Sequence, residues 1–555
     1  MIRIQEVIRL NARIWLGYPP NIASKNFLGS FFFNVDRVFT KVQPITTIFS
    51  SIVRIHTHCQ SSFYSHSLTS TVLRCDTQAK NNAPTKIPAV DPAHFQPLGT
   101  WTSEQLHQSR AEHPFMMTWV PGQARHNVPN MTHGEGVYLY DEEGHQYLDW
   151  TSQAVCANLG HSVPKSLVEA AAYQMTQLPF TYGGIGMTEV RTRMNQLMAE
   201  ILPGNLRAAV FPSSGAEANE AGILMARRFT GRQKIISWYR SYHGATAAAG
   251  AATGDFRRWY GSDNNPGFVK AFNPFPLFFN HGGNGATEEE RVQSALNMLE
   301  EQILNEGPEN VASILMESIV GAGGCLIMPT GYMQGIRAIC DKYGILMHVD
   351  EVMVGFGRTG KLFGFQHYDG VMPDIVSAAK GISGAAIPLS MTACSEEIMN
   401  FFEDKPLGWG STYQAHPVAL ATAYEAVKFL IQNDIVGHVQ HLAPIFAANM
   451  QRLADQHPCI KQYRAIGLFG CFDVQDLTGA IPKLQHEPAH DAFHKYKEAY
   501  HKAGLVGLHR YPHVHCAPPL VITEDELLDG FDRLSTALAV LDDALGFHSP
   551  EKLSQ

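Results

Sequence analysis

The sequence has few cysteines, no long apolar run and no excess of positive charge. Its nine cysteines are scattered, odd in number and without a CxxC pair. This pattern argues against a disulfide framework and a zinc site, and it favours a reducing compartment. No apolar stretch reaches the length of a bilayer span, so we expect no membrane partner. The formal net charge of −9 offers no basic field to a phosphate backbone, so we expect no nucleic-acid partner either.

Several common site motifs are also absent. There is no HExxH-like pair for a metal, and neither GxxxxGK[ST] nor GxGxxG for a nucleotide, so we expect no metal. The 555 residues are 45% hydrophobic and 17% charged, which is typical of a globular protein long enough for more than one core. Small molecules are therefore the expected ligands of a two-domain enzyme.

The first ninety residues differ in composition from the rest. From position 1 to 75 there are eight Lys or Arg residues but only two acidic ones, Glu6 and Asp36, with many Ser and Thr residues from position 50 onward. Such a composition is typical of a transit peptide, and the segment 1–15 has the apolar spacing of an amphipathic helix. We expect mitochondrial targeting, or a cytoplasmic location otherwise. A disordered extension and a mistaken start site stay as alternatives.

Beyond this segment, short apolar runs alternate with helical patterns. Residues 136–150 predict a β-hairpin around the turn-forming DEEG. The later strand-like runs are AAVF (208–211), KIISW (234–238), ASILM (312–316), ILMHV (345–349) and DIVSA (374–378). Helical patterns such as 217–229 separate them, and long helices follow residue 417. This alternation predicts an α/β fold with a parallel sheet and a second, smaller domain.

Polar residues with useful chemistry stand where these strands end. Glu317, Asp350 and Lys380 each follow a strand, and the turn PSSGAE (212–217) follows AAVF. Ligands of parallel sheets bind outside the carboxyl ends of the strands, so one ligand could touch all four. Taken singly, each acidic residue is also explained as a helix cap, and Lys380 as a solvated loop residue.

The turn PSSGAE suggests the chemistry of the ligand. Small residues that open a helix leave backbone N–H groups and the helix dipole free to hold a phosphate, although the motif alone is weak. A phosphate site, a strand-end aspartate and a lysine together match the requirements of pyridoxal phosphate, namely a lysine Schiff base and an acidic partner for the pyridinium nitrogen. We therefore expect pyridoxal phosphate as the cofactor.

Five segments together resemble the class III aminotransferases, which are pyridoxal-phosphate enzymes of fold type I. They are SSGAEANE (213–220), SYHGAT (241–246), HVDEVMVGFGRTGKLFGF (348–365), PDIVSAAKGISGAAIPLS (373–390) and GSTYQAHP (410–417). The resemblance extends from about residue 136 to the C-terminus. Two further segments are most similar to taurine or β-alanine aminotransferases and related ω-aminotransferases: RSYHGATAAAGAATGDFRRW (240–259) and MESIVGAGGCLIMPTGY (316–332).

The resemblance implies a domain plan. It is an α/β protein of fold type I, with a large domain built on a mainly parallel seven-stranded sheet and a smaller α+β domain. We expect residues 1–90 to be the transit peptide and linker, 91–160 an N-terminal segment of the small domain, 161–416 the large cofactor-binding domain, and 417–555 the C-terminal small domain.

The resemblance also implies the two catalytic residues. Lys380 would form the Schiff base with the cofactor and, once released, move the proton that the reaction transfers. Desolvation and the neighbouring cationic cofactor would lower its pKa, as a lysine nucleophile near neutral pH requires. Asp350 would pair with the protonated ring nitrogen of the cofactor.

The remaining site residues carried over by the resemblance bind the cofactor or the substrate. Ser214, Gly215 and Ala216 would hold the phosphate, and Thr412 would reach the phosphate of the neighbouring subunit, which implies a homodimer. Tyr242 and Val352 would press on the two faces of the cofactor ring, with Glu317 near it. Arg464 would bind a substrate carboxylate with its planar fork. Taken singly, each of these residues is more simply explained by a position in a turn, in the core or on the surface.

One position departs from the family pattern. Many relatives carry glutamine after DEV, where this chain has Met353, whose thioether is a weak acceptor. The contact of that glutamine with the cofactor's phenolic oxygen is therefore absent or supplied elsewhere, which puts the substrate subgroup in doubt. His161 and His243 follow family motifs too, but we interpret them as packed or turn-capping residues.

The resulting hypothesis is a ping-pong transaminase. An ω-amino compound such as taurine, β-alanine or 4-aminobutyrate would donate the amino group, and pyruvate or 2-oxoglutarate would accept it. A related reaction on the same fold, a decarboxylation or an intramolecular amino shift, is one alternative. A noncatalytic binder of a phosphate ligand is the other.

Overall fold

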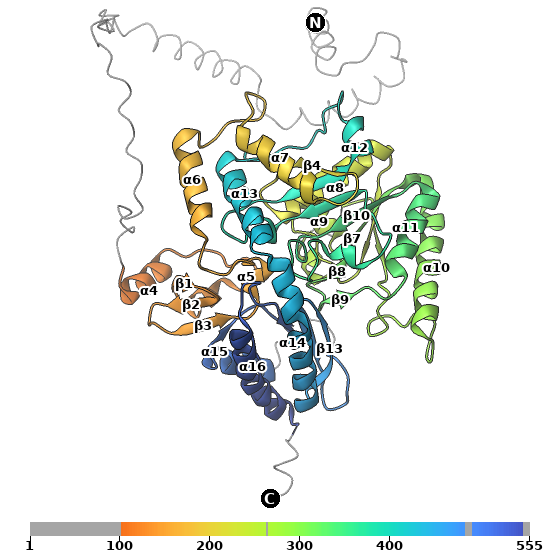
Figure 1. Ribbon diagram of the computed structural model, residues 1–555. Coiled ribbons are helices and arrows are strands. Elements are labelled where there is room, and N and C mark those ends of the chain that lie inside the picture. The colour runs from red at the N-terminus through yellow and green to blue at the C-terminus, as the bar shows by residue number, and fades with distance from the viewer. Residues whose placement is uncertain (1–100, 262–264, 483–490, 548–555) are drawn as a thin grey trace, which may run out of the picture. The chain divides into compact units, whose positions relative to one another are not determined.

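A computed structural model describes residues 101–261, 265–482 and 491–547 (Figure 1). All the described residues belong to one compact unit, Pro88–Gln555. The predicted transit peptide lies outside the described residues. The domain boundaries expected at 160 and 416 stay predictions.

A seven-stranded sheet forms the centre of this unit, in the order β4-β12-β11-β10-β7-β5-β6. Its strands are β4 (Leu206–Val210), β5 (Lys234–Trp238), β6 (Phe268–Ala271), β7 (Val311–Glu317), β10 (Leu346–Asp350), β11 (Ile375–Ala378) and β12 (Met391–Ser395). Neighbouring strands are parallel except at β12, which is antiparallel to both β11 and β4. The predicted mainly parallel sheet is therefore confirmed.

The strands of the sheet centre are buried along their whole length. Every residue of β7, β10 and β11 is buried, which explains why their sequences are mainly apolar instead of alternating, although Ser313, His348 and Ser377 lie within them. No sequence pattern predicts β6 and β12. β6 contains the charged Lys270, and β12 carries Thr392 and Ser395, so neither has an uninterrupted apolar run.

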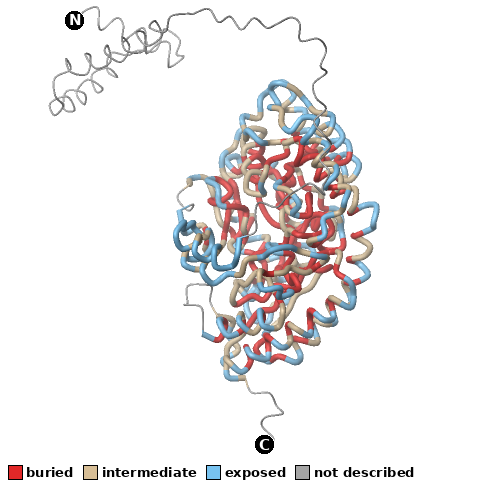
Figure 2. Tube along the Cα trace, turned by 90° about the vertical axis from the view of Figure 1, so that its left-hand side faces the viewer, coloured by how far each residue is buried: buried red, intermediate tan, exposed pale blue. Residues whose placement is uncertain are grey.

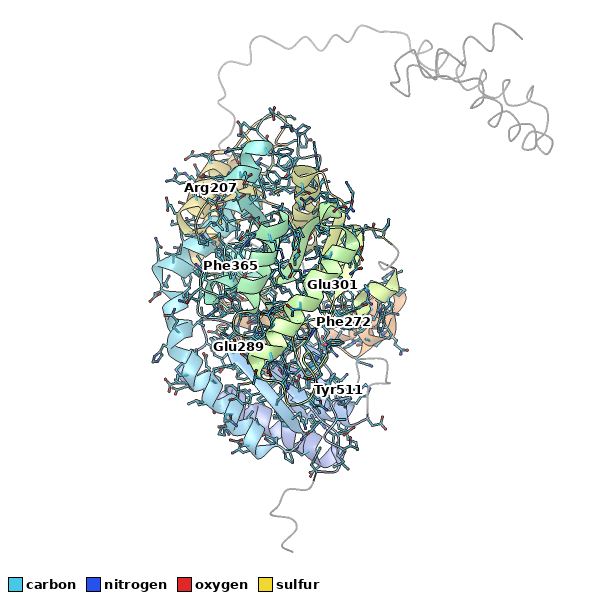
Figure 3. The ribbon with its side chains drawn as sticks, turned by 90° about the vertical axis from the view of Figure 1, so that its right-hand side faces the viewer. Arg207, Phe272, Glu289, Glu301, Phe365 and Tyr511 are labelled. Carbon is cyan, nitrogen blue, oxygen red and sulfur yellow. The ribbon has the colours of Figure 1, made fainter. Side chains whose placement is uncertain are left out.

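Helices cover the sheet (Figure 1). They are α6 (Lys165–Gln177), α7 (Glu189–Ile201), α8 (Gly215–Thr230), α9 (Ala247–Ala252), α10 (Glu288–Glu306), α11 (Tyr332–Tyr343), α12 (Glu396–Phe401) and α13 (Pro417–Gln432). Helix α8 packs on β7, β10, β11 and β12. Helix α11 packs on β10, and α10 packs on α11. Figure 3 views the α10 side, where Glu289 and Glu301 are exposed on the helix and Phe365 is buried.

The remaining elements form smaller sheets and their helices. One sheet has the order β1-β2-β3-β15, another β13-β14-β17-β16, and β8 pairs with β9. Their strands are β1 (Met131–Glu135), β2 (Tyr138–Asp141), β3 (Gln146–Asp149), β8 (Ile319–Val320), β9 (Leu326–Ile327), β13 (Ile460–Ile466), β14 (Phe469–Val474), β15 (Leu505–Val506), β16 (His509–Arg510) and β17 (His513–Cys516). The predicted hairpin is present as β2 and β3.

Five helices accompany these smaller sheets. They are α4 (Ser103–Glu112), α5 (Ser152–Val155), α14 (Ile435–Gln456), α15 (Asp491–Lys502) and α16 (Glu524–Leu545). Strand β15 pairs with β3, so residues 505–506 join the sheet of the N-terminal hairpin. The small domain expected from residues 91–160 and 417–555 stays a prediction.

Short 3₁₀ helices complete the chain: η2 (Gly122–His126), η3 (Phe256–Tyr260), η4 (Pro308–Asn310), η5 (Gly364–His367) and η6 (Lys380–Ile382). Figure 2 shows the buried residues concentrated in the interior, where apolar side chains from the central sheet and its helices pack together. The seven cysteines among the described residues are all free. Within those residues, no helix has the length and apolar character that crossing a membrane requires.

Candidate active site

A cavity of about 430 Å³ opens at the carboxyl ends of the central strands. Four strands end at it, because Glu317 ends β7, Asp350 ends β10, Lys380 follows β11 and the turn 212–217 follows β4. The residues that line it are Cys156, Ser213, Ser214, Gly215, Ala216, Asn219, Tyr242, His243, Gly244, Glu317, Ala322, Asp350, Val352, Met353, Ala379, Lys380, Ser383, Ala385, Ile387, Pro388 and Leu389. The structure thus brings together eight of the ten predicted site residues.

Asp350 is a buried carboxylate held by three donors. His243 Nδ1 donates to its Oδ2 at 2.8 Å, Asn219 Nδ2 donates to the same oxygen at 2.7 Å, and the Val352 N–H donates to Oδ1 at 2.9 Å. Burial by itself raises the pKa of Asp350, but the hydrogen bonds and the His243 ring lower it more, so the pKa is below its ordinary value. Asp350 is therefore ionised inside the protein.

Lys380 lies at the start of η6, directly after β11. Its φ of 44° is in the left-handed region, which a residue with a side chain adopts only under constraint from its surroundings. Burial lowers the pKa of Lys380, while the nearby Cys156, Asp350 and Glu317 raise it to a smaller extent. The net effect favours the neutral amine, which is the nucleophilic form.

The turn 213–216 forms the start of α8. Ser214 is the N-cap residue, and its Oγ accepts from the Glu217 N–H at 3.3 Å. A Cβ at Gly215 would lie 2.8 Å from both methyl groups of Val352, so only glycine allows the turn and Val352 to approach so closely. The first N–H groups of α8 have no partner inside the helix and face the cavity end of the sheet, where an anion is stabilised.

Glu317 and Tyr242 form another part of the wall. Glu317 accepts from the Tyr242 N–H at 2.9 Å and from the Gly321 N–H at 2.7 Å. Burial raises the pKa of Glu317 to about 7 despite these bonds. The Tyr242 ring lies under the Arg257 guanidinium, 3.4 Å from Cζ to the ring centroid, and Arg257 is ion-paired with Asp255.

Met353, where many relatives have glutamine, also lines the cavity. A Cβ at Gly321 would lie 1.9 Å from its sulfur, so the loop after β7 passes directly over the thioether. The Met353 side chain therefore fills space by packing, and it does not reproduce the hydrogen bond that a glutamine amide could donate.

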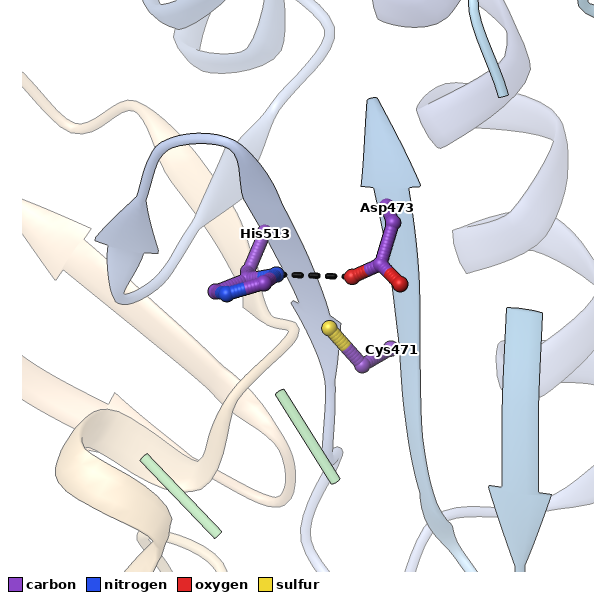
Figure 4. Close-up of side chains that lie close together, drawn as sticks. All are labelled: Cys471, Asp473 and His513. Atoms are coloured by element: carbon purple, nitrogen blue, oxygen red, sulfur yellow. Dashed lines mark hydrogen bonds and ion pairs between the residues drawn. The ribbon is translucent and has the colours of Figure 1, made fainter. Parts of the chain in front are cut away.

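Arg464 and Thr412 are the two predicted site residues that do not line the cavity. Arg464 Nη1 and Nη2 donate to the two oxygens of Asp473 at 2.7 and 2.8 Å, and Nε donates to the Gly324 carbonyl at 2.8 Å. His513 Nδ1 donates to Asp473 as well, at 2.7 Å (Figure 4). Arg464 thus forms a buried ion pair here, and the expected carboxylate contact requires that pair to open.

The group drawn in Figure 4 also has the composition of a metal site, since one ligand atom each of Cys471, Asp473 and His513 lies within 4.8 Å of the others. Both carboxylate oxygens are already bonded to the Arg464 cation, which would repel a metal ion. Burial raises the pKa of Cys471 well above its ordinary value, so the thiol is neutral. The group is accordingly an ion-pair network.

Two residues of the site escape prediction from the sequence. The sequence favours a packed or capping role for His243, and the ring is indeed packed, yet it also holds Asp350. Asn219 lies in SSGAEANE, and its amide donates both to Asp350 and to the His243 carbonyl, the latter at 2.8 Å. The position of Asn219 in the sequence could have predicted this contact, because Asn219 lies one helical turn after the turn 213–216 and so on the same side of α8. His161 instead donates to Asp149 at 2.9 Å, away from the cavity.

Comparison with known proteins places this fold among the transaminases. A taurine:2-oxoglutarate aminotransferase from Bifidobacterium kashiwanohense, solved with pyridoxal phosphate and glutamate, superposes with a TM-score of 0.74 at 34% identity, over 81% of this chain and 100% of that one. Residues 121–538 match the family model of the class-III aminotransferases. The chain belongs to that family and is a transaminase dependent on pyridoxal phosphate.

Curated relatives differ among themselves in the amino donor. A probable gamma-aminobutyrate transaminase 4 of Oryza sativa subsp. japonica is 32% identical over 71% of this chain and 83% of its own length. A putrescine–pyruvate aminotransferase of Pseudomonas aeruginosa is 34% identical over 62% of this chain and 76% of its own. The family and the fold type expected from the sequence are confirmed. Relatives with 32% to 34% sequence identity do not determine which amino donor this chain uses.

The residues present fit the cofactor. The cavity offers one ionised, buried carboxylate, one lysine whose pKa is lowered by burial, and one helix N-terminus of small residues for a phosphate. These are the protein groups that pyridoxal phosphate requires.

Proposed function

We propose that this chain transfers an amino group from an ω-amino compound of the taurine, β-alanine or 4-aminobutyrate type to a 2-keto acid, 2-oxoglutarate or pyruvate. The observation that carries the proposal is the convergence of Lys380 and Asp350 on one cavity. The likeness to taurine and gamma-aminobutyrate enzymes supports the ω-amino class of donor.

In this proposal each residue of the cavity has a defined part in holding the cofactor. Asp350 would face the ring nitrogen, and the N–H groups of Gly215 and Ala216 with the Ser214 hydroxyl would hold the phosphate. Tyr242 and Val352 would lie against the two faces of the ring. When bound, pyridoxal phosphate supplies the aldehyde that takes the amino group and a ring that stabilises negative charge on the substrate.

Lys380 and Glu317 act on protons and on the wall around that ring. Lys380 would hold the cofactor covalently through Nζ. As a free amine it would take the substrate proton at Nζ and return it, and burial, which lowers its pKa, favours the neutral form that this role requires. Glu317 fixes the loop 317–321 and the Tyr242 backbone through its two accepted hydrogen bonds. Asp350 stays ionised throughout, since three donors stabilise its charge.

Borohydride trapping tests the covalent link. Reduction of the cofactor-loaded enzyme followed by peptide mass mapping should find the pyridoxyl group on Lys380, and its location on another lysine would contradict the proposal. A panel of amines and keto acids then tests the substrates, with loss of the cofactor's absorption band as the readout for each donor. Repeated turnover of a substrate amine with no transfer of its amino group to a keto acid would favour the decarboxylase or amino-shift alternative.

Arg464 is proposed to bind the carboxylate of the keto acid after Asp473 releases it. The bidentate geometry that it makes with Asp473 is the geometry that a substrate carboxylate would require. Arg464→Gln should raise KM for the keto acid while the affinity for the cofactor stays unchanged. Unchanged kinetics would assign Arg464 a structural role only.

A homodimer is proposed from an exposed apolar surface. Its members on α6, the following loop and residue 413 are 44% to 85% exposed: Tyr173, Met175, Leu178, Ile185, Met187 and Tyr413. Such a cluster of large apolar side chains is typical of a subunit interface. Thr412, exposed and next to Tyr413, is then positioned to reach the cofactor phosphate of a second copy.

Mitochondrial import is proposed from the composition of residues 1–90 alone. A fluorescent protein fused to this segment should colocalise with mitochondria. A diffuse cytosolic signal would refute the targeting proposal and leave the catalytic one intact.

A further inference from the structure

Arg358 is a fully buried arginine to which the proposed mechanism assigns no part. Its exposure is 0%, and it forms no ion pair with any residue that the structure describes. Burial lowers the pKa of Arg358 to about 9, although Asp149 and Cys156 act in the opposite direction. A buried guanidinium costs free energy unless other groups compensate it, so its surroundings have to supply that compensation.

Four oxygen atoms from three parts of the chain surround the Arg358 guanidinium. Nη1 donates to the carbonyl oxygen of Leu468 at 3.0 Å and to that of Pro518. Nη2 donates to Ser152 Oγ and to Asn158 Oδ1, both at 3.0 Å. None of these acceptors carries a charge, so the hydrogen bonds fix the positions of the three segments without neutralising the cation.

The segment 152–158, which Arg358 contacts at both ends, has an unusual backbone. Ser152, Gln153 and Val155 have φ values of 46°, 60° and 57°. Residues with side chains adopt such values only where their surroundings impose them, and a β-branched residue such as Val155 does so rarely. The two hydrogen bonds from Arg358 are among the contacts that impose this backbone.

This segment forms part of the wall of the active-site cavity beside Lys380. Its Cys156 lines the cavity, as Lys380 does. Burial lowers the pKa of Lys380, and Arg510 acts in the same direction. Cys156 raises that pKa, and it does so more than Asp350 or Glu317. The Cys156 thiol therefore lies close to the lysine amine, and the position of the segment governs how much water reaches Nζ.

Asn158 contacts the backbone directly after Lys380. A Cβ at Gly381 would lie 2.5 Å from Asn158 Nδ2, so only glycine lets η6 approach this amide so closely. Nδ2 also donates to the Phe356 carbonyl at 3.4 Å. A continuous line of contacts therefore runs from Arg358 through Asn158 to the glycine that is bonded to the lysine.

We propose that Arg358 is a positioning residue for Lys380. Through Ser152 and Asn158 it holds the segment 152–158 against η6, so that Nζ of the lysine is kept out of water and inside the cavity. This inference rests on the proposed role of Lys380 and adds a residue that acts behind it. The planar guanidinium reaches acceptors on two sides at fixed angles, which the single ammonium group of a lysine at this position would not reproduce.

The test uses the cofactor-loaded enzyme with Arg358→Lys, which keeps the positive charge but loses the planar fork. The absorption band of the cofactor changes with pH, because its bond to Lys380 takes up a proton. In the variant the midpoint of this change should rise by about one pH unit or more, since water that enters beside Nζ stabilises the protonated form. The value of kcat should fall about 10-fold to 100-fold, as expected for a misplaced reacting group.

Two further measurements distinguish positioning from a loss of folded protein. A donor deuterated at the carbon that carries its amino group should show a larger isotope effect with Arg358→Lys than with wild type, because proton transfer by Lys380 is the step that slows. Ser152→Ala removes only one acceptor and should shift the midpoint in the same direction by less, so it carries the test if Arg358→Lys does not fold. An unchanged or lower midpoint in the folded variants would overturn the proposal.

Arg232→Lys is the matched control. The Arg232 guanidinium also donates to neutral oxygens, and the acceptors of its Nη1, at 2.9 to 3.2 Å, are the carbonyl groups of Pro308, Val311, Tyr343 and Gly344. Val311 begins β7, so this arginine lies at the end of the sheet opposite to the cavity. The control should lower Tm, as Arg358→Lys does, while the midpoint and the isotope effect stay those of wild type.

Hydrogen exchange of the full chain separates this inference from the proposed function. In Arg358→Lys the amides of 152–158 and of η6 should exchange at least about 10-fold faster than in wild type, while those of α16 keep their rates. Equal acceleration throughout the chain would show general loosening and overturn the assignment of Arg358. If the local effect appears but borohydride trapping finds the cofactor on another lysine, the proposed function fails while the restraint by Arg358 stands.

Discussion

Asp350 carries a negative charge where water has little access, and its neighbours make that possible. His243, Asn219 and the Val352 N–H together supply three hydrogen bonds to the two oxygens. In the proposed function this charge would lie opposite the cationic ring nitrogen of the cofactor, so that no solvent has to reorganise when negative charge develops on the substrate. His243 and Asn219 would then act through Asp350 as positioning residues.

Asp350→Asn should leave the cofactor bound but lower kcat about 10²-fold to 10³-fold, as loss of a preorganised electrostatic group does. The neutral amide cannot stabilise the protonated ring nitrogen, and its NH₂ group also faces the donors of His243 and Asn219. Cofactor absorbance and single-turnover rates measure the two effects separately.

Asp374→Asn is the control for that change. Asp374 stands before β11, at the opposite edge of the same sheet, where it pairs with Arg337 at 2.7 Å. Its replacement should leave the single-turnover rate near that of wild type. A normal rate in Asp350→Asn would remove Asp350 from the mechanism.

At the scale of elements, the site depends on how closely α8 lies on β10. Gly222 of α8 is buried, and a Cβ there would lie 2.3 Å from Cε1 of His348. The His348 ring cannot move into water, because its Nε2 is bonded to Ser377 at 2.8 Å. Burial lowers the pKa of His348 to about 3, which keeps the ring neutral. Close approach of the helix brings Asn219 within reach of Asp350.

Gly222→Ala should destabilise the protein although alanine favours a helix. The propensity gain is about 1 kcal/mol, whereas overpacking a core typically costs about 1–3 kcal/mol, and displacement of α8 adds to that cost. Thermal unfolding should show a lower Tm, together with weaker cofactor binding. In Gly122→Ala the new methyl group meets only the end of a flexible arginine at 3.4 Å, so its Tm should stay unchanged.

Glu351 joins the end of β10 to the segment around η5. Its oxygens accept from Ser318 Oγ at 2.6 Å, the Gly364 N–H at 2.7 Å and the Phe365 N–H at 2.9 Å. Burial raises the pKa of Glu351 from 4.5 to about 7. Between these two pH values the folded protein therefore keeps a proton on Glu351 that the unfolded chain has lost.

This proton makes stability depend on pH with a definite sign. This proton contributes up to about 3 kcal/mol to the free energy of unfolding. The contribution is fully present below about pH 4.5 and is lost as the pH rises through about 7. Between about pH 5 and 8 the Tm of wild type should fall more steeply than that of Glu351→Gln, which cannot titrate. The variant should have the lower Tm at about pH 5, because its amide opposes one of the N–H donors. Parallel curves would show that Glu351 does not titrate in this range.

At the scale of the whole molecule, completion of the active site depends on the proposed second copy. Thr412 is exposed and does not line the cavity of its own chain. The apolar surface beside it includes Ile185 at 85% exposure and Tyr413 at 62%. A dimer through this surface removes apolar area from water and brings Thr412 to the other cavity.

Ile185→Asp combined with Tyr413→Asp should yield monomers with little activity. An unpaired carboxylate in an interface costs about 3 kcal/mol or more, so the dimer should weaken at least about 100-fold. Light scattering after size-exclusion chromatography measures the mass. Met298→Asp, at an apolar residue on α10 with 41% exposure, should stay dimeric. Dimers in the double variant would place the interface elsewhere.

The sequence by itself determined the sheet and the residues at its edge. Buried parallel strands are continuous apolar runs, and a residue directly after such a run must lie at the carboxyl edge of the sheet. Glu317, Asp350 and Lys380 could therefore be assigned to one site from their positions in the chain alone. Strands β6 and β12 were not predicted, because Lys270, Thr392 and Ser395 interrupt their apolar pattern.

Only the tertiary structure decided which charges are compensated. Arg464 and Arg510 look alike in sequence, yet one meets Asp473 across β13 and β14 while the other meets no anion among the described residues. His243 likewise gave no sign that its ring would reach Asp350, 107 positions away. Ion pairs and long-range hydrogen bonds depend on distances of a few ångströms between segments that only packing brings together, and local sequence patterns do not carry that information.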